Sequence, residues 1–165
     1  MSDETGRRGG AGRPAPPDSL SPGPGVIRGA RWVAVLAGLV FLAGVIWKVA
    51  AWEQHVAALG AYGVLDFLPA GLLAAGSLVL EVGIAALLLM PKSWHRGLLA
   101  GAGFLLFTAV VLAWETLSGG GGDCGCLPFL TRSIGWAAVG QNLAGTLFMG
   151  SLGMLGTLGE EDQSG

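Results

Sequence analysis

Four long apolar stretches restrict this chain more than any other feature. They run approximately over residues 30–51, 67–90, 97–117 and 134–158. Each has about 20 residues or more, enough for a helix to cross a hydrocarbon core about 30 Å thick. A water-soluble helical domain needs polar faces that these stretches do not offer. The sequence therefore predicts an all-α integral membrane protein with four transmembrane helices in an up-down bundle.

Composition supports that class, because 52% of the residues are hydrophobic and only 12% are charged. Soluble domains carry about twice that share of charge. Residues 1–29 differ, since they are rich in Gly, Pro, Ser and Arg and contain no apolar run. We interpret them as a disordered cytoplasmic tail, followed by a membrane domain at 30–158 and a short acidic tail at 159–165. The net charge of −2 and the lack of a basic groove argue against nucleic-acid binding.

Positive charge near the ends of the spans predicts the orientation. Arginines cluster before the first span, and Lys92 and Arg96 lie between the second and third. The other two links are poor in Lys and Arg. We therefore expect a multi-pass protein of the inner or plasma membrane, with both termini cytoplasmic and the first and third links extracytoplasmic.

The third link contains both cysteines of the chain, Cys124 and Cys126, within "GGGGDCGC". A bridge between cysteines one residue apart closes a very small ring, so it would add little stability and would be easily reduced. Extracytoplasmic compartments favour disulfides. A redox-active pair, an inert disulfide and a metal site that includes His55 all stay open, although a zinc site would need more ligands than these residues supply.

Ionisable groups inside a membrane are costly and are candidate functional residues. Three lie inside the predicted spans, Lys48, Glu81 and Glu115, whereas Arg31 stands at the start of the first span. Counting 1.5 Å per residue places Lys48 and Glu115 at one level near the outer interface, so we expect these two to pair. Glu81 falls near the midplane, where a contact with Lys48 would require both side chains to be stretched. We expect Glu81 to be protonated or to bond Asn142 or Thr108.

Several segments together resemble the methylamine-utilisation protein MauE family and its DoxX-like relatives. They are "GLVFLAGVIWKVAAWEQHVAALGAYGVL", "LPAGLLAAGSLVLEVGIAALLL", "DCGC" and "GQNLAGTLF", and the likeness covers roughly residues 33–155. The resemblance implies a four-helix inner-membrane protein that supports maturation of an extracytoplasmic, disulfide-rich protein. It also implies functional positions at Cys124, Cys126, Lys48 and Glu81. DoxX-like relatives imply a quinone-linked oxidoreductase subunit as an alternative.

This chain departs from that family's pattern at two places. Leu127, Pro128 and Phe129 follow the cysteine motif where Phe-Gly is usual, and Asn142 follows Gln141 where Arg is expected. The substrate therefore need not be the same, and methylamine metabolism is not implied by the residues themselves. Our hypothesis is a membrane thiol–disulfide oxidoreductase that exchanges with an extracytoplasmic protein or a thioredoxin-like partner and passes electrons to a quinone or partner. The alternative is a non-enzymatic scaffold or export component whose cysteines are permanently bridged.

Overall fold

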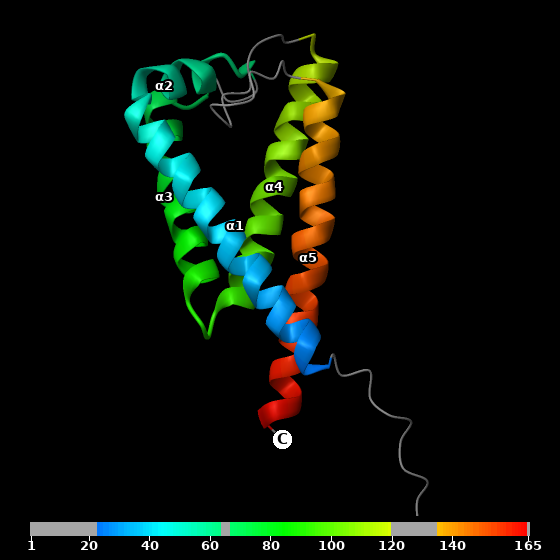
Figure 1. Cartoon of the computed structure of the whole chain (residues 1–165). Coiled ribbons are helices and arrows are strands. Elements are labelled where there is room, and N and C mark those ends of the chain that lie inside the picture. The colour runs from blue at the N-terminus through cyan, green and yellow to red at the C-terminus, as the bar shows by residue number, and fades with distance from the viewer. Residues whose placement is uncertain (1–22, 64–66, 120–134, 165) are drawn as a thin grey trace, which may run out of the picture.

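The computed structural model describes residues 23–63, 67–119 and 135–164. These residues form an all-helical protein, as predicted (Figure 1). The helices are α1 (Pro24–Ala50), α2 (Trp52–Gly60), α3 (Ala70–Leu89), α4 (Trp94–Leu117) and α5 (Trp136–Ser164).

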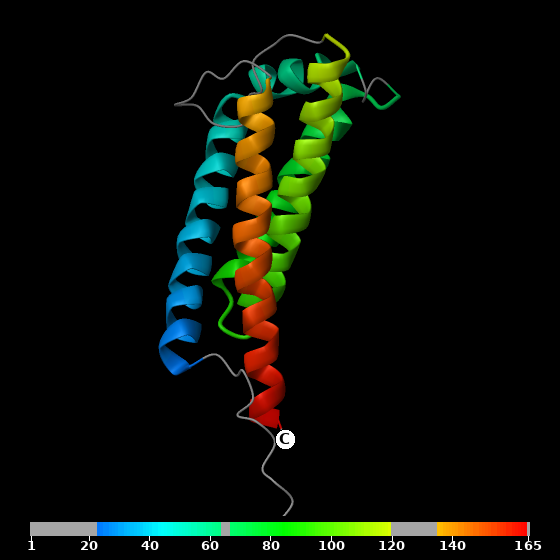
Figure 2. The same cartoon turned by 90° about the vertical axis from the view of Figure 1, so that its right-hand side faces the viewer.

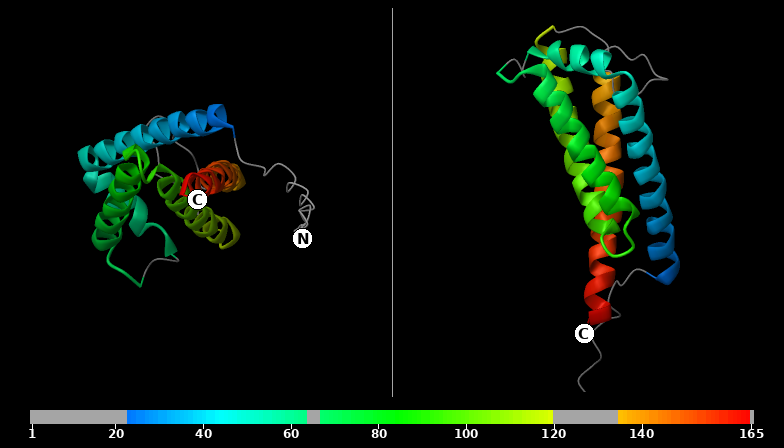
Figure 3. Two further views of the ribbon diagram at one scale, coloured as in Figure 1. Left: turned by 90° about the horizontal axis from the view of Figure 1, so that it is seen from below. Right: turned by 90° about the vertical axis from the view of Figure 1, so that its left-hand side faces the viewer.

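Four of these helices are long and alternate in direction along the bundle. α1 ascends in Figure 1, α3 descends, α4 ascends and α5 descends, while α2 lies across the upper end (Figures 1 and 2). α1 packs most extensively against α3, and α4 against α5. Figure 3 shows from below that α1 runs obliquely across the other helices. We call the two ends of the bundle the α2 end and the turn end, the latter after the turn at residues 90–93 between α3 and α4.

Three helices are long and apolar enough to cross a membrane: Gly25–Ala50, Ala70–Leu89 and Trp94–Leu117. The fourth predicted span is helical too, as α5, but it is not among the three. Gln141, Asn142 and many small residues lower its hydropathy. Apolar side chains cover the outside of the long helices, including Trp32, Ile46, Val79, Phe107 and Leu147, each at least 60% exposed. Such a surface suits lipid rather than water, so the chain is a multi-pass membrane protein.

Three element boundaries differ from expectation. α1 begins at Pro24, so residues 24–29 are helical rather than part of the tail. Proline suits the first helical turn, where its missing N–H has no intrahelical acceptor to lose. α5 continues to Ser164, through the predicted acidic tail. The first link contains a helix, α2, because Ala51 breaks the path of α1 and nine residues turn across the end of the bundle.

The core at the turn end is apolar and tightly packed. Ile84 and Leu88 of α3 meet Leu98 of α4 there, together with Ala30, Ala34, Trp94, Ala102 and Met149. Gly97 allows the closest approach, since a Cβ at this position would lie 2.6 Å from the backbone nitrogen of Leu88. α5 uses glycines similarly, because a Cβ at Gly153 would lie 2.9 Å from the side chain of Leu99. Small residues thus bring the helices together where lipid provides no hydrophobic drive.

Candidate functional site

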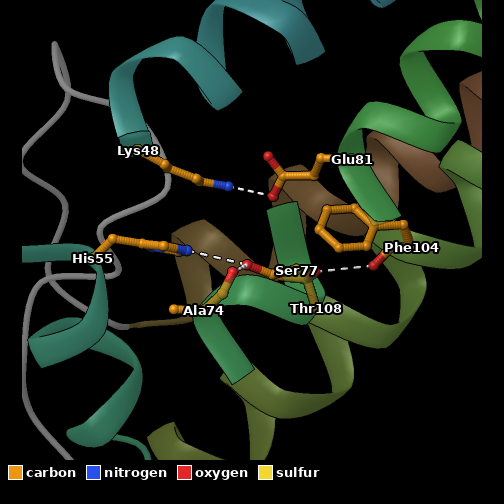
Figure 4. A network of polar contacts seen from close by, with 7 residues as sticks. All are labelled: Lys48, His55, Ala74, Ser77, Glu81, Phe104 and Thr108. Atoms are coloured by element: carbon orange, nitrogen blue, oxygen red, sulfur yellow. Dashed lines mark hydrogen bonds and ion pairs between the residues drawn. The ribbon is translucent and has the colours of Figure 1, made fainter. Parts of the chain in front are cut away.

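A buried ion pair joins α1 to α3 in the half of the bundle nearer α2. The ammonium group of Lys48 donates to a carboxylate oxygen of Glu81 (Figure 4). Lys48 is 9% exposed and Glu81 is 3% exposed. Both residues lie in helices that can span a membrane. Buried charges are tolerated when they are paired, and this geometry satisfies that condition.

This pairing corrects the sequence analysis, which expected Lys48 to meet Glu115. In a helix, Cα–Cβ bonds tilt toward the N-terminus. Because α1 and α3 are antiparallel, the Lys48 side chain leans away from the α2 end and the Glu81 side chain leans toward it. The estimate of depth from 1.5 Å per residue gave only the height of each backbone position, so it missed that the two side chains lean toward each other. Gly44, one turn below Lys48, faces the same carboxylate, since a Cβ there would lie 4.0 Å from Glu81 Oε2, an ordinary van der Waals distance.

The other expected partners of Glu81 bond within their own helices instead. The Thr108 hydroxyl donates to the carbonyl of Phe104 over 2.9 Å (Figure 4). The Asn142 amide donates to the carbonyl of Ala138, also over 2.9 Å. A side chain that donates to the carbonyl four residues earlier uses that donor within its own helix. The prediction that Glu81 bonds Asn142 or Thr108 was therefore wrong.

A second polar contact lies beside the ion pair and joins α2 to α3. His55 Nε2 lies 3.0 Å from the hydroxyl oxygen of Ser77, and that hydroxyl donates to the carbonyl of Ala74 over 2.9 Å (Figure 4). With the Ser77 proton assigned to the carbonyl of Ala74, the histidine is assigned as the donor, with its hydrogen on Nε2. Ser77 and Glu81 are four residues apart, so both contacts lie on one face of α3.

Electrostatics favour the neutral form of His55. Burial lowers the pKa of this imidazole below its ordinary value of 6.5, and the positive charge of Lys48 lowers it further. The imidazole and the ion pair are therefore electrostatically linked. Sequence reasoning considered His55 only as a metal ligand and missed Ser77. The four-residue spacing of Ser77 and Glu81 was a usable signal, but the contact depends on how α2 folds back.

Glu115 is also buried, at 4% exposure, on α4 near its α2 end. Close to it in sequence, Leu112 packs in a second core cluster with Tyr62, Ala138 and Val139. Tyr62 lies two residues after the end of α2, so this cluster connects the segment after α2 to α4 and α5.

Cys124 and Cys126 lie outside the described residues. The described helices show where their segment is attached: α4 ends and α5 begins at the α2 end of the bundle (Figures 1 and 2). The described part of the chain contains no cluster of three or more His, Cys, Asp or Glu side chains suited to a metal ion.

Comparison with known proteins gives one clear result. No curated protein and no solved structure matches the chain. The family model described as "Methylamine utilisation protein MauE" matches residues 28–158, which is most of the sequence and includes both cysteines and the ion pair. All four long helices fall wholly or largely within this range. The chain therefore belongs to the MauE family.

Proposed function

We propose that this protein is a membrane thiol–disulfide oxidoreductase that matures an extracytoplasmic protein. α1, α3, α4 and α5 would all cross the bilayer, with both termini in the cytoplasm and the α2 end facing outward. Cys124 and Cys126 would be the exchanging pair. One observation carries the proposal: the matched family range includes the cysteine motif, which lies in the sequence between α4 and α5.

The proposed reaction is balanced in two steps. A thiolate of the partner attacks the Cys124–Cys126 disulfide and forms a mixed disulfide, which the partner's second thiol resolves. The partner gains a disulfide, and this protein is left with two thiols. A quinone, or a thioredoxin-like protein in its disulfide form, then accepts the two electrons and two protons and restores the disulfide. Lys48, Glu81, Glu115 and Asn142 would support this chemistry from within the membrane domain.

Cysteine trapping tests the exchange. In Cys124→Ser or Cys126→Ser, a mixed disulfide with the oxidised form of the extracytoplasmic protein should accumulate, because the remaining cysteine can attack that disulfide but lacks the second thiol that would release it. It should disappear after reduction and be absent from the variant lacking both cysteines. A scaffold with a permanently bridged pair gives no such adduct, and its bond resists mild reductant in native membranes. That result would reject the exchange reaction.

The orientation needs its own test in a cysteine-free background. Ser118→Cys places a thiol at the end of α4, and Lys92→Cys places one in the turn between α3 and α4; both positions are exposed. A membrane-impermeant maleimide added to intact cells should label the Ser118→Cys variant and spare the Lys92→Cys variant. The reverse pattern would put the cysteine segment in the cytoplasm and remove its oxidising environment.

A further inference from the structure

Two neighbouring polar contacts lie at the α2 end, Lys48 with Glu81 and His55 with Ser77, and thiol exchange alone does not account for the second of them. A buried ion pair in a protein interior is often no more stabilising than apolar side chains of the same volume. In a membrane span, such charges commonly belong to ion or proton pathways. Here the pair is accompanied by a histidine and a hydroxyl, the side chains from which proton relays are built.

We propose that His55, Ser77, Glu81 and Lys48 form a proton-exchange site, in which His55 and Ser77 carry protons between the aqueous phase at the α2 end and the buried ion pair. The ligand of this site is the proton itself. The proposal does not depend on the cysteines and stands or falls independently of thiol exchange.

The order of the groups supports a path. His55 lies on α2, outside the three candidate spans, and the preceding residues Glu53 and Gln54 are exposed. The imidazole itself is buried and donates to Ser77. Ser77 lies one helical turn from Glu81 on the same face of α3. Figure 4 shows the two contacts side by side, with His55 and Lys48 reaching α3 from the same direction.

Each group has the chemistry that its place requires. A hydroxyl accepts one hydrogen bond while donating another, so Ser77 can pass a proton along by rotating. With its hydrogen on Nε2, neutral His55 has Nδ1 as the nitrogen that takes up an incoming proton. In the ion pair, the Lys48 ammonium donates to Glu81, so a proton that reaches the pair meets a carboxylate able to accept it.

The surroundings of His55 favour its neutral form, so a proton that it takes up is readily passed on. α2 packs mainly against α1 and α3, while Leu59 near its end packs against the second core cluster. The charged groups that these elements contribute are Lys48 from α1 and Glu81 from α3, while Glu53 of α2 itself is exposed. Burial and Lys48 both lower the pKa of His55. A proton on His55 is thus held weakly and can move on.

A pH jump followed by infrared spectroscopy tests the path in protein reconstituted in lipid nanodiscs. After acidification, a carboxylic-acid band should appear that is missing from Glu81→Gln. In His55→Gln, which keeps a donor but cannot carry a proton, the band should appear about tenfold more slowly or worse. Ser77→Ala, which removes the hydroxyl, should also slow it. Glu53→Gln, on the same helix but exposed, should match the wild type.

Two results would overturn the proposal. One is a spectrum in which Glu81→Gln removes no band, because the pair then exchanges no proton. The other is an unchanged rate in both His55→Gln and Ser77→Ala. Circular dichroism establishes that each variant is folded, and either variant suffices if the other does not fold.

The link between His55 and the pair has a separate readout. The chain has only two histidines, so ¹⁵N-histidine NMR reports His55 with His95, at the turn end, as internal reference. In the double variant Lys48→Met/Glu81→Gln, the pKa of His55 should rise, because the positive charge is gone while burial remains. Lys92→Met, an exposed lysine at the turn end, should leave it unchanged. Equal titrations in all three proteins would contradict the coupling.

Discussion

The two ends of the bundle are built on opposite principles. At the turn end, α3, α4 and α5 meet through glycines and apolar side chains, and Leu88 and Leu98 are almost completely buried. At the α2 end, α4 and α5 still meet through an apolar cluster, but α1 and α2 meet α3 through polar contacts: Lys48 with Glu81, and His55 with Ser77. The same antiparallel helices thus provide a close-packed base at one end and a charged interior at the other.

The difference indicates where this protein places stability and where it places chemistry. Close packing at the turn end needs no specific polar geometry and tolerates no added volume. Polar groups at the α2 end depend on their partners, because losing one leaves the other buried and unpaired. Functional residues should therefore be sought at the α2 end, where the segment with Cys124 and Cys126 is also attached.

The largest effect should come from breaking the ion pair on one side only. Lys48→Met leaves the Glu81 carboxyl buried without its cation, and we expect a loss of about 3–5 kcal/mol in the free energy of unfolding. The double variant Lys48→Met/Glu81→Leu removes both charges and should cost less than about 1 kcal/mol. Unfolding in SDS of the protein in detergent measures both. A double variant that is as unstable as the single one would show that the pair contributes as packing volume, not as charge.

At the turn end, added volume should be the sensitive change. In Gly97→Ala, the new Cβ would overlap the backbone of Leu88, which cannot turn aside, so we expect a loss of about 1–3 kcal/mol. Gly103→Ala is the matched control on the same helix, because nothing lies within 4 Å of its Cβ position. Alanine there should be neutral or should stabilise the helix by about 0.5–1 kcal/mol. Equal effects at both positions would mean that the helices are not closely packed at Gly97.

The base of the bundle was easier to predict from sequence than the polar end. Twenty or more apolar residues specify a membrane helix almost regardless of context, so α1, α3 and α4 were predicted with small errors at their ends. α2 was missed because nine mixed residues with one histidine give no clear periodic signal. It turns only because the chain must cross from α1 to α3.

The polar contacts were only partly predictable. Lys48 and Glu81 were identified as unusual because charge is rare in apolar stretches. Their pairing was missed because a count of residues along a helix gives the level of the backbone and not the direction of a long side chain. His55–Ser77 could not be found at all without α2. The type of residue thus indicates which side chains are candidates for function, whereas finding the partner of each side chain requires the folded structure.

A smaller effect is expected where α2 meets α3. Ser77→Ala removes the acceptor of His55 Nε2–H and should cost about 1–2 kcal/mol. Ser151 offers a matched control, because its hydroxyl also donates to a carbonyl three residues earlier but is exposed on α5. Ser151→Ala should change the free energy of unfolding by less than about 0.5 kcal/mol. Similar values for both variants would show that the His55 contact adds nothing to the α2 end.

The smallest effect, and the one specific to the polar end, is a dependence on pH. Because the pKa of His55 is lowered in the folded protein, the unfolded chain binds this proton more readily. Its contribution to stability is therefore fully present above the ordinary value of 6.5 and is lost as pH falls below it. The difference in free energy of unfolding between wild type and His55→Gln should thus shrink between pH 7 and pH 5. A difference that is constant over this range would mean that His55 titrates alike in the folded and unfolded protein, and that the α2 end is no more sensitive to protons than the turn end.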